Sequence, residues 1–185
     1  IAVYRFPALD MCRYKTLIDH AVHAGIRIMN MSMGSSNIDD WTCFATTAQH
    51  SPSILFIVSA GNNGRNINDF PIYPAALPLD NLFVVSSADD FGRPGLSSNF
   101  SSQHVDVFVP AEQLPVIDHR GVRTFTGGTS YAAPRVAALA ARYLRANPHA
   151  DTQQIIDFLQ QRAIDSEQNM SAFGWIPDPT DDYGF

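Results

Sequence analysis

TFTGGTSYAAPRVAALAARYLRA, residues 124–146, is the stretch that most strongly decides the fold. Its two glycines, Gly127 and Gly128, allow a tight turn and the close approach of another group. A helix is predicted to start near Thr129 or Ser130, which places Pro134 within a first turn that tolerates its missing N–H. The residues that follow are small and apolar on almost every side, which predicts a helix buried in the core.

Ser130 lies at the start of this helix, and its position supports three interpretations. It could cap the helix N-terminus, as serine commonly does. It could border an anion or phosphate site at a glycine-rich helix start. It could also be a nucleophile whose developing oxyanion is stabilised by the helix N-terminus. A phosphate site would need a cation near the loop, and Arg123 is the only candidate, because Arg135 follows the proline.

The composition is that of an ordinary globular chain, with 185 residues of which 45% are hydrophobic and 16% charged. We expect one domain over residues 1–185, with an irregular tail over residues 171–185. The net charge of −6 disfavours nucleic acid as a partner, and no apolar run reaches the length of a membrane segment. Cys12 and Cys43 are too few for a disulfide scaffold and lack metal-ligand spacing, and their pairing is left open.

Strands and helices are predicted to alternate along the chain. Residues 1–6 read as a short strand already under way at the first residue, which suggests a piece of a longer chain. Asp10 is predicted to cap a helix that Gly25 ends, and a buried strand over residues 26–31 follows. This order predicts a right-handed βαβ unit in a parallel sheet.

The later elements extend the same pattern and predict an α/β fold with a mostly parallel sheet. A second amphipathic helix is expected to bury Trp41, Phe44, Ala45 and Ala48. The other expected elements are strands 54–58, 82–86 and 105–109, a hairpin of residues 115–118 and 122–125, and a helix that starts at a capping box of Asp151 and Gln154. The polar loop of residues 59–64 follows a central strand, where open α/β sheets bind ligands.

Several segments resemble motifs of the subtilisin-like serine proteases, in the order that this family uses. Over residues 1–164, these segments are MNMSMG (29–34), SAGNNG (59–64), the Tyr73–Pro74 pair, FSS (100–102) with Asp106, Val107 and Pro110, and GTSYAAP (128–134). Ala111 and Glu112 replace an expected glycine. The resemblance implies a three-layer α/β sandwich whose N-terminal part is missing, activity as a serine endopeptidase, and a cis bond before Pro74.

The resemblance also implies the roles of individual residues. Ser130 would be the nucleophile, and Asn62 would donate its side-chain amide to the oxyanion. The residues that would bind the polypeptide substrate are Ser32, Met33, Gly34, Ser59, Ala60, Gly61, Gly128 and Thr129. Met33 and Met11 could contact the substrate further from the cut or belong to the core. The loop 59–64 contains no acidic residue, which predicts an uncharged primary pocket that favours apolar or aromatic side chains.

The chain departs from the family pattern in the aspartate and the histidine that would form a catalytic triad with Ser130. Neither a D-[ST]-G nor an H-G-T-H motif occurs in these 185 residues, so the Asp and His are expected upstream, in a missing N-terminal part that would be this chain's partner. The six histidines, none of which has the expected context, are predicted to be solvated: His20, His23, His50, His104, His119 and His149. The alternative is a catalytically inactive peptide-binding domain. No cofactor or metal site is identified, although the family allows calcium, and it favours a secreted or cell-envelope location.

Overall fold

The computed structural model describes residues 1–5, 10–165 and 169–180. At its centre lies a parallel sheet in the order β1 (Ile28–Met31), β2 (Leu55–Ser59), β3 (Leu82–Ala88) and β4 (Val107–Pro110). The helices are α1 (Arg13–His23), α2 (Thr42–Gln49), which a 3-10 turn η1 (Ile38–Trp41) precedes, α3 (Thr129–Ala146) and α4 (Thr152–Gln161). Strands β5 (Leu114–Ile117) and β6 (Arg123–Thr126) form the predicted antiparallel hairpin.

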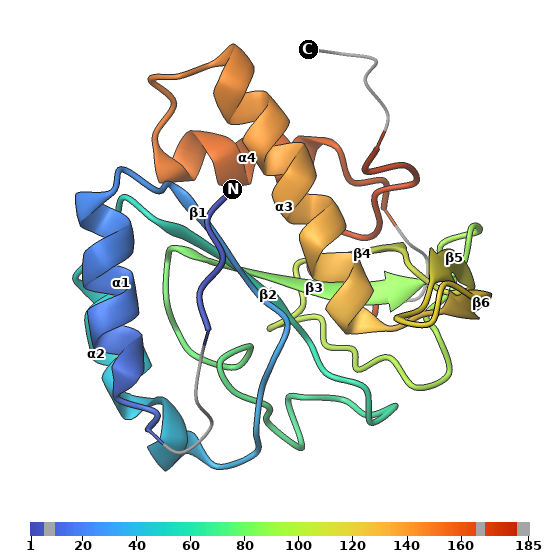
Figure 1. Cartoon of the computed structure of the whole chain (residues 1–185). Coiled ribbons are helices and arrows are strands. Elements are labelled where there is room, and N and C mark those ends of the chain that lie inside the picture. Colours follow the sequence, from blue (N-terminus) through green and yellow to red (C-terminus); the bar gives the residue numbers. More distant parts are fainter. Residues whose placement is uncertain (6–9, 166–168, 181–185) are drawn as a thin grey trace.

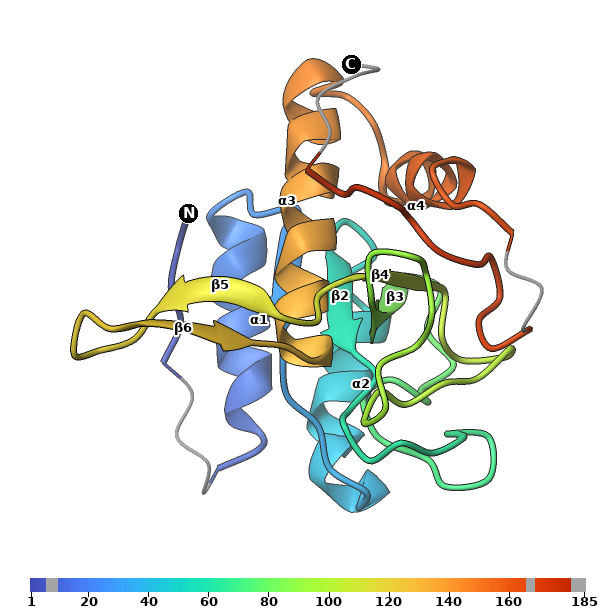
Figure 2. The same ribbon diagram turned by 90° about the vertical axis from the view of Figure 1, so that its right-hand side faces the viewer.

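The strands separate two apolar cores, which makes the fold the three-layer α/β sandwich that the family resemblance implies. Successive strand side chains point to opposite faces of a sheet. Phe56 and Val58 of β2 therefore pack toward α1 and α2, whereas Leu55 and Ile57 pack toward α3 and α4. Figures 1 and 2 show the two pairs of helices on opposite faces of the sheet. All five residues of β2 are buried, as expected of a central parallel strand.

The N-terminal predictions are partly wrong. Residues 1–5 form no strand, and Phe6 lies outside the described residues, so β1 is the first strand and an edge of the described sheet. Asp10 does not cap α1 with its side chain, because the N-cap is Cys12 and Asp10 supplies only its backbone carbonyl to Arg13 N–H. Gly25 does end the helix, with a φ of 70° that favours glycine.

Helix α3 is not buried on every side, which corrects the prediction made from its composition. Ala132, Val136 and Leu139 are buried against the sheet, but Pro134, Ala138 and Ala141 are exposed. These exposed residues line a groove of about 750 Å³ that runs beside β1 and the first four residues of the chain. The apolar face of α3 therefore extends beyond the part that the described residues bury.

The remaining predictions largely agree with the structure. Ala45 is only half-buried, whereas Trp41, Phe44 and Ala48 are buried as expected. Asp151 and Gln154 form the predicted capping box of α4, with bonds of 2.8 and 2.9 Å. Residues 169–180 contain no helix or strand and are attached to the sheet where Trp175 forms isolated bridges with Phe108 and Ile164.

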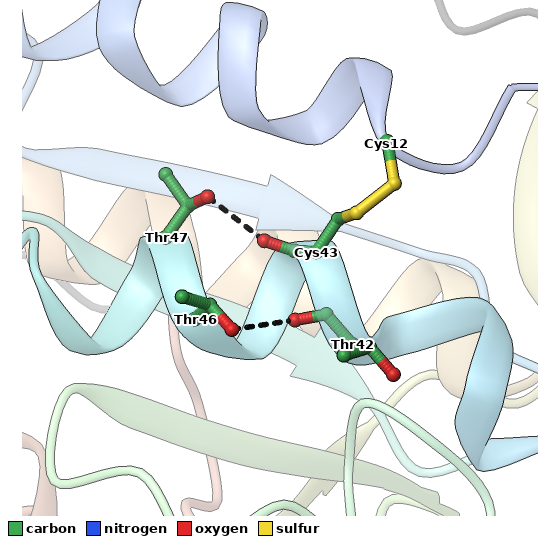
Figure 3. Close-up of a disulfide and its surroundings, with 5 residues drawn as sticks. All are labelled: Cys12, Thr42, Cys43, Thr46 and Thr47. Carbon is green, nitrogen blue, oxygen red and sulfur yellow. Dashed lines mark hydrogen bonds between the residues drawn. A yellow bond between two sulfur atoms is a disulfide. The ribbon is translucent and has the colours of Figure 1, made fainter.

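Cys12 and Cys43 form a disulfide, which settles the question that their spacing left open (Figure 3). The bond joins the N-cap of α1 to the first turn of α2. Nearby in α2, the hydroxyls of Thr46 and Thr47 each donate to the carbonyl four residues earlier, at 3.0 and 2.8 Å. Both helices on this face are thus tied together covalently near their N-termini.

Candidate active site

Helix α3 begins at the edge of the sheet where the carboxyl ends of the strands meet. Its N-cap is Gly128, whose φ of 115° favours glycine, so Ser130 is the second helical residue. The interpretation of Ser130 as the N-cap is therefore wrong. Thr129 is fully buried, whereas Ser130 is half-buried and Tyr131 is exposed. The Ser130 side chain thus lies at the border between the core and the solvent.

Asn62, in the loop after β2, is bound to the start of α3 through its side-chain oxygen. Asn62 Oδ1 accepts hydrogen bonds from the backbone N–H and the hydroxyl of Thr129, at 2.9 and 3.0 Å. The same hydroxyl accepts a bond of 3.2 Å from Gly61 N–H. Because two donors occupy Oδ1, the amide nitrogen of Asn62 is the end of the side chain left to donate elsewhere. The oxygen end of the Asn62 side chain is thus bound to Thr129, the residue that precedes Ser130.

Gly128 permits the close approach of Asn62 to this helix. A Cβ atom at residue 128 would lie 3.0 Å from Asn62 Oδ1. The surroundings of this turn also bear on the phosphate interpretation. A Cβ atom at Gly127 would lie 2.9 Å from both the Ala111 carbonyl oxygen and a Glu112 carboxylate oxygen. Oxygen acceptors around both glycines repel an anion, so the geometry disfavours a phosphate site here.

Ser32, immediately after β1, contacts α3 through its side chain. Its hydroxyl donates to the backbone carbonyl of Ser130 at 3.0 Å. In a regular helix that carbonyl accepts the N–H of the residue four positions later, which here is Pro134 and has none. Pro134 is therefore beyond the first turn of α3, and its predicted place within that turn is wrong. Ser32 donates to the carbonyl that the proline leaves without its helical donor.

The two predicted substrate-binding segments, residues 32–34 and 59–61, lie at the carboxyl ends of neighbouring strands. Ile72, which the sequence analysis missed, lies close to both of them. A Cβ atom at Gly34 would lie 3.1 Å from the Ile72 Cγ2 methyl, and one at Gly61 would lie 3.5 Å from it. Ser35 pairs with Tyr73 through two backbone hydrogen bonds of 2.9 and 2.8 Å, and the Tyr73–Pro74 bond is cis as predicted. Ile72 immediately precedes the predicted Tyr73–Pro74 pair, and this position was the feature of the sequence that could have indicated its place near the site.

The two methionines near this site differ in exposure. Met33 is exposed, and its sulfur accepts a hydrogen bond of 2.8 Å from the Tyr14 hydroxyl. Burial raises the pKa of Tyr14 well above its usual value, so this hydroxyl stays protonated. Met11, by contrast, is partly buried against the core that includes α1 and α2. Met33 is thus the methionine of this pair that is open to contact from outside.

None of the six histidines, all of which lie in described residues, hydrogen-bonds to Ser130. His20 Nδ1 bonds to the Tyr4 hydroxyl at 2.8 Å, so this exposed histidine also contacts the N-terminal segment. His23 and His50 bond to carbonyls of their own helices. Within the described ranges, no three His, Cys, Asp or Glu side chains group in a way that could hold a metal ion, so calcium remains an expectation from the resemblance. The described helices include none that is long and apolar enough to cross a membrane.

Most of the chain is similar to known proteins. The model described as "Subtilase family" matches residues 2–175. The chain is 28% identical to the cell wall-associated protease of Bacillus subtilis, over 90% of this chain and 18% of that protein. It is 28% identical to subtilisin DY of Bacillus licheniformis, over 79% of this chain and 53% of that protein.

A solved structure gives the same result at the level of the fold. The self-cleaved protease domain of PatA superposes with a TM-score of 0.71 and 26% identity, over 92% of this chain and 66% of that chain. The chain spans at most about half the length of the two curated relatives described above. Together with the parallel sheet and the glycine-capped helix α3, the match over residues 2–175 shows that this chain belongs to the subtilase family of serine proteases.

Proposed function

We propose that this chain is the part of a serine endopeptidase that carries the nucleophile and the oxyanion site, with Ser130 and Asn62 in these roles. The observation that carries the proposal is the pair of hydrogen bonds from Thr129 to Asn62 Oδ1. They occupy the oxygen end of the Asn62 side chain, so its amide N–H groups would be free to donate to an oxyanion formed at Ser130, the residue after Thr129. The backbone N–H of Ser130, in the first turn of α3, is a second donor available to an oxyanion.

The chemistry follows from these positions. Ser130 Oγ would attack the peptide carbonyl carbon, its proton would pass to a histidine, and the oxyanion would accept bonds from Asn62 and the Ser130 N–H. The histidine would return the proton to the amine as the C–N bond breaks. Water would then hydrolyse the acyl-enzyme by the same path. The histidine and its orienting aspartate would come from the part of the domain upstream of this chain.

The groove beside β1 is where that upstream part would bind. β1 is paired on one side only in the described sheet, so its other edge presents free backbone donors and acceptors. The groove of about 750 Å³ lies between this strand, the exposed stripe of α3 and the first four residues. An added strand there would extend the sheet and bury Pro134, Ala138 and Ala141 in one domain with residues 1–185.

The substrate would bind as an extended strand between residues 32–34 and 59–61, with the glycines admitting its backbone. Ile72 would then form the closed end of the primary pocket, and Gly128 and Thr129 its border with the nucleophile. The alternative function is a catalytically inactive domain that only binds peptides, in which the upstream part of the domain would supply no histidine to Ser130. The two functions share the groove and differ in turnover.

One experiment separates them. The full-length protein is treated with a serine-directed phosphonate, and the labelled residue is identified by peptide mapping. We expect labelling at Ser130 and its loss in Ser130→Ala, together with loss of peptide hydrolysis. Peptide binding without labelling or turnover would support the inactive domain. Labelling that persists in Ser130→Ala would mean that another residue is the nucleophile.

A secreted or cell-envelope location is part of the proposal. The Cys12–Cys43 disulfide supports it, because disulfides form and persist mainly in oxidising compartments. Fractionation of the native host with thiol trapping tests it. We expect the protein in the extracellular or envelope fraction, with both cysteines paired and therefore not alkylated by the thiol reagent. A reduced protein in the cytosol would contradict this expectation.

A further inference from the structure

Asn99 is a fully buried polar residue in the loop between β3 and β4, 0% exposed. Its side chain and backbone bond to the loop that carries Asn62. Asn99 Oδ1 accepts hydrogen bonds from the N–H groups of Asn63 and Arg65, at 3.0 and 3.2 Å. Its amide nitrogen donates to the Ala60 carbonyl at 2.9 Å, and its backbone N–H donates to the Gly61 carbonyl at 3.0 Å.

These four bonds enclose Asn62 from both sides along the chain. Two go to residues 60 and 61 before it, and two go to residues 63 and 65 after it. Asn62 itself is exposed and directs its side chain toward Thr129. Asn99 therefore bonds to the backbone on both sides of Asn62, alongside the bonds of Gly61 N–H to Thr129 and of Gly64 N–H to the Ser97 carbonyl.

The fit between Asn99 and this loop is close. A Cβ atom at Gly61 would lie 2.6 Å from the Asn99 amide nitrogen, so Gly61 is the residue that lets Asn99 approach. Asn99 is itself fixed from the sheet, because the buried Ser86 hydroxyl of β3 donates to its carbonyl at 2.5 Å. The chain of contacts runs from a core strand through Asn99 to the loop.

We infer that Asn99 is a positioning residue for the oxyanion donor: it fixes the loop so that the Asn62 amide meets the developing charge. The inference rests on the proposed function of Asn62 and Ser130. An oxyanion donor is effective only when it is held where charge develops, because its reorganisation would otherwise cost free energy during the reaction. A displacement of about 1 Å at such a site can cost about a hundredfold in rate.

The chain contains a matched control in Asn81, another buried asparagine whose side chain holds backbone groups. Its amide nitrogen donates to the carbonyls of Ala48, Ser51 and Ile54 at 3.0 to 3.1 Å. Asn81 immediately precedes β3, at the amino end of the sheet and away from the candidate site. Replacing it removes buried hydrogen bonds without touching the Asn62 loop.

A double-mutant cycle in the full-length protein tests the inference. The four proteins are wild type, Asn99→Leu, Asn62→Ala and the double variant, each measured for kcat, KM and melting temperature. Asn99→Leu has nearly the same shape but no hydrogen-bonding groups. We expect it to lower kcat about 10- to 100-fold with KM changed less than threefold, and to change kcat less than threefold in the Asn62→Ala background. Asn81→Leu should lower the melting temperature while leaving kcat within a factor of three.

If Asn99→Leu does not fold, Asn99→Asp provides the same cycle. It keeps an acceptor for Asn63 and Arg65 but places a second oxygen against the Ala60 carbonyl in place of the donor. A loss of kcat is therefore expected, and it should again be absent in the Asn62→Ala background. Equal effects of Asn99→Leu or Asn99→Asp with and without Asn62, or a loss of kcat in Asn81→Leu as large as in Asn99→Leu, would overturn the inference. A wild-type protein without any Ser130-dependent turnover would instead overturn the proposed function, and this role with it.

Discussion

The Ser32 hydroxyl donates a hydrogen bond of 3.0 Å to the backbone carbonyl of Ser130, across 98 positions of sequence. The bond joins the segment after β1 to the second residue of α3 at the carbonyl that Pro134 leaves without its helical donor. Because Pro134 has no N–H to donate within the helix, the Ser130 carbonyl is available to accept a tertiary hydrogen bond. The contact couples a predicted wall of the substrate site to the residue proposed as the nucleophile.

Ser32→Ala should therefore lower both stability and kcat. We expect a loss of about 1 kcal/mol in the free energy of unfolding, because a partly buried carbonyl loses its donor. A fall in kcat is expected as the start of α3 becomes less fixed. Chemical denaturation and peptide hydrolysis by the full-length protein measure the two effects. In a Pro134→Ala background, where residue 134 regains an N–H, both effects should shrink, and undiminished effects there would contradict this explanation.

In the full-length protein, Asn62→Ala should lower kcat by about a hundred- to thousandfold, the range known for the oxyanion donor of subtilisin. KM should change little, because the oxyanion exists only in the transition state. Thr129→Val, which removes the hydroxyl bond to Asn62 Oδ1 but keeps the N–H bond, should give a smaller loss of kcat. Steady-state kinetics on a peptide ester and a peptide amide provide the test. A loss confined to KM would mean that Asn62 only shapes the groove.

Ile72→Gly should extend the primary pocket and shift cleavage toward larger side chains. The Ile72 methyl lies near both Gly34 and Gly61, so its removal opens space between the two walls. The uncharged character of the pocket remains a prediction, and it favours apolar residues before the cut in both proteins. A peptide library cleaved by wild type and variant measures the shift. A profile dominated by lysine and arginine, or one unchanged in the variant, would contradict the assignment of this pocket.

Loss of the Cys12–Cys43 disulfide should destabilise the chain by about 2–4 kcal/mol, because the bond closes a loop with a sequence separation of 31. The paired variant Cys12→Ser/Cys43→Ser and the reduced wild type should unfold at similar, lower denaturant concentrations. Denaturation with and without reductant measures this difference. If reductant lowers the denaturation midpoint of the wild type no more than that of the paired variant, the disulfide does not contribute to stability.

Asp106, the residue before β4, should make the free energy of unfolding depend on pH. Burial raises the pKa of its carboxyl group to about 7, only partly opposed by a hydrogen bond of 2.6 Å from Val84 N–H. Between the unfolded pKa, near 4, and about 7, the folded state binds a proton that the unfolded state has released, so this group's contribution to stability falls as pH rises. Asp106→Asn, which keeps an acceptor for Val84, should flatten that slope. Denaturation at pH 5 and pH 7.5 compares the two proteins, and equal slopes would contradict the prediction.

Much of the architecture followed from local sequence, because it depends on local periodicity and turn chemistry. The apolar runs near residues 54–58 and 82–86 lie at β2 and β3, and Gly25 ends α1 with a positive φ. The chemistry of GTSYAAP, residues 128–134, likewise depends on local sequence. Its glycine adopts a φ of 115° at the start of α3, a conformation that favours glycine.

Other features depended on contacts between distant segments, and the sequence analysis missed or misplaced them. Residues 1–5 are apolar enough for a strand, yet a strand also needs a paired neighbour. The side chain of Asn99 reads as an ordinary loop asparagine until the fold places it against residues 60–65. The same holds for Ile72 and for the hydroxyl of Ser32. The sequence by itself determined which residues are proposed for catalysis. Only the tertiary structure decided how those residues are held, because hydrogen bonds between distant loops produce no periodic pattern along the chain.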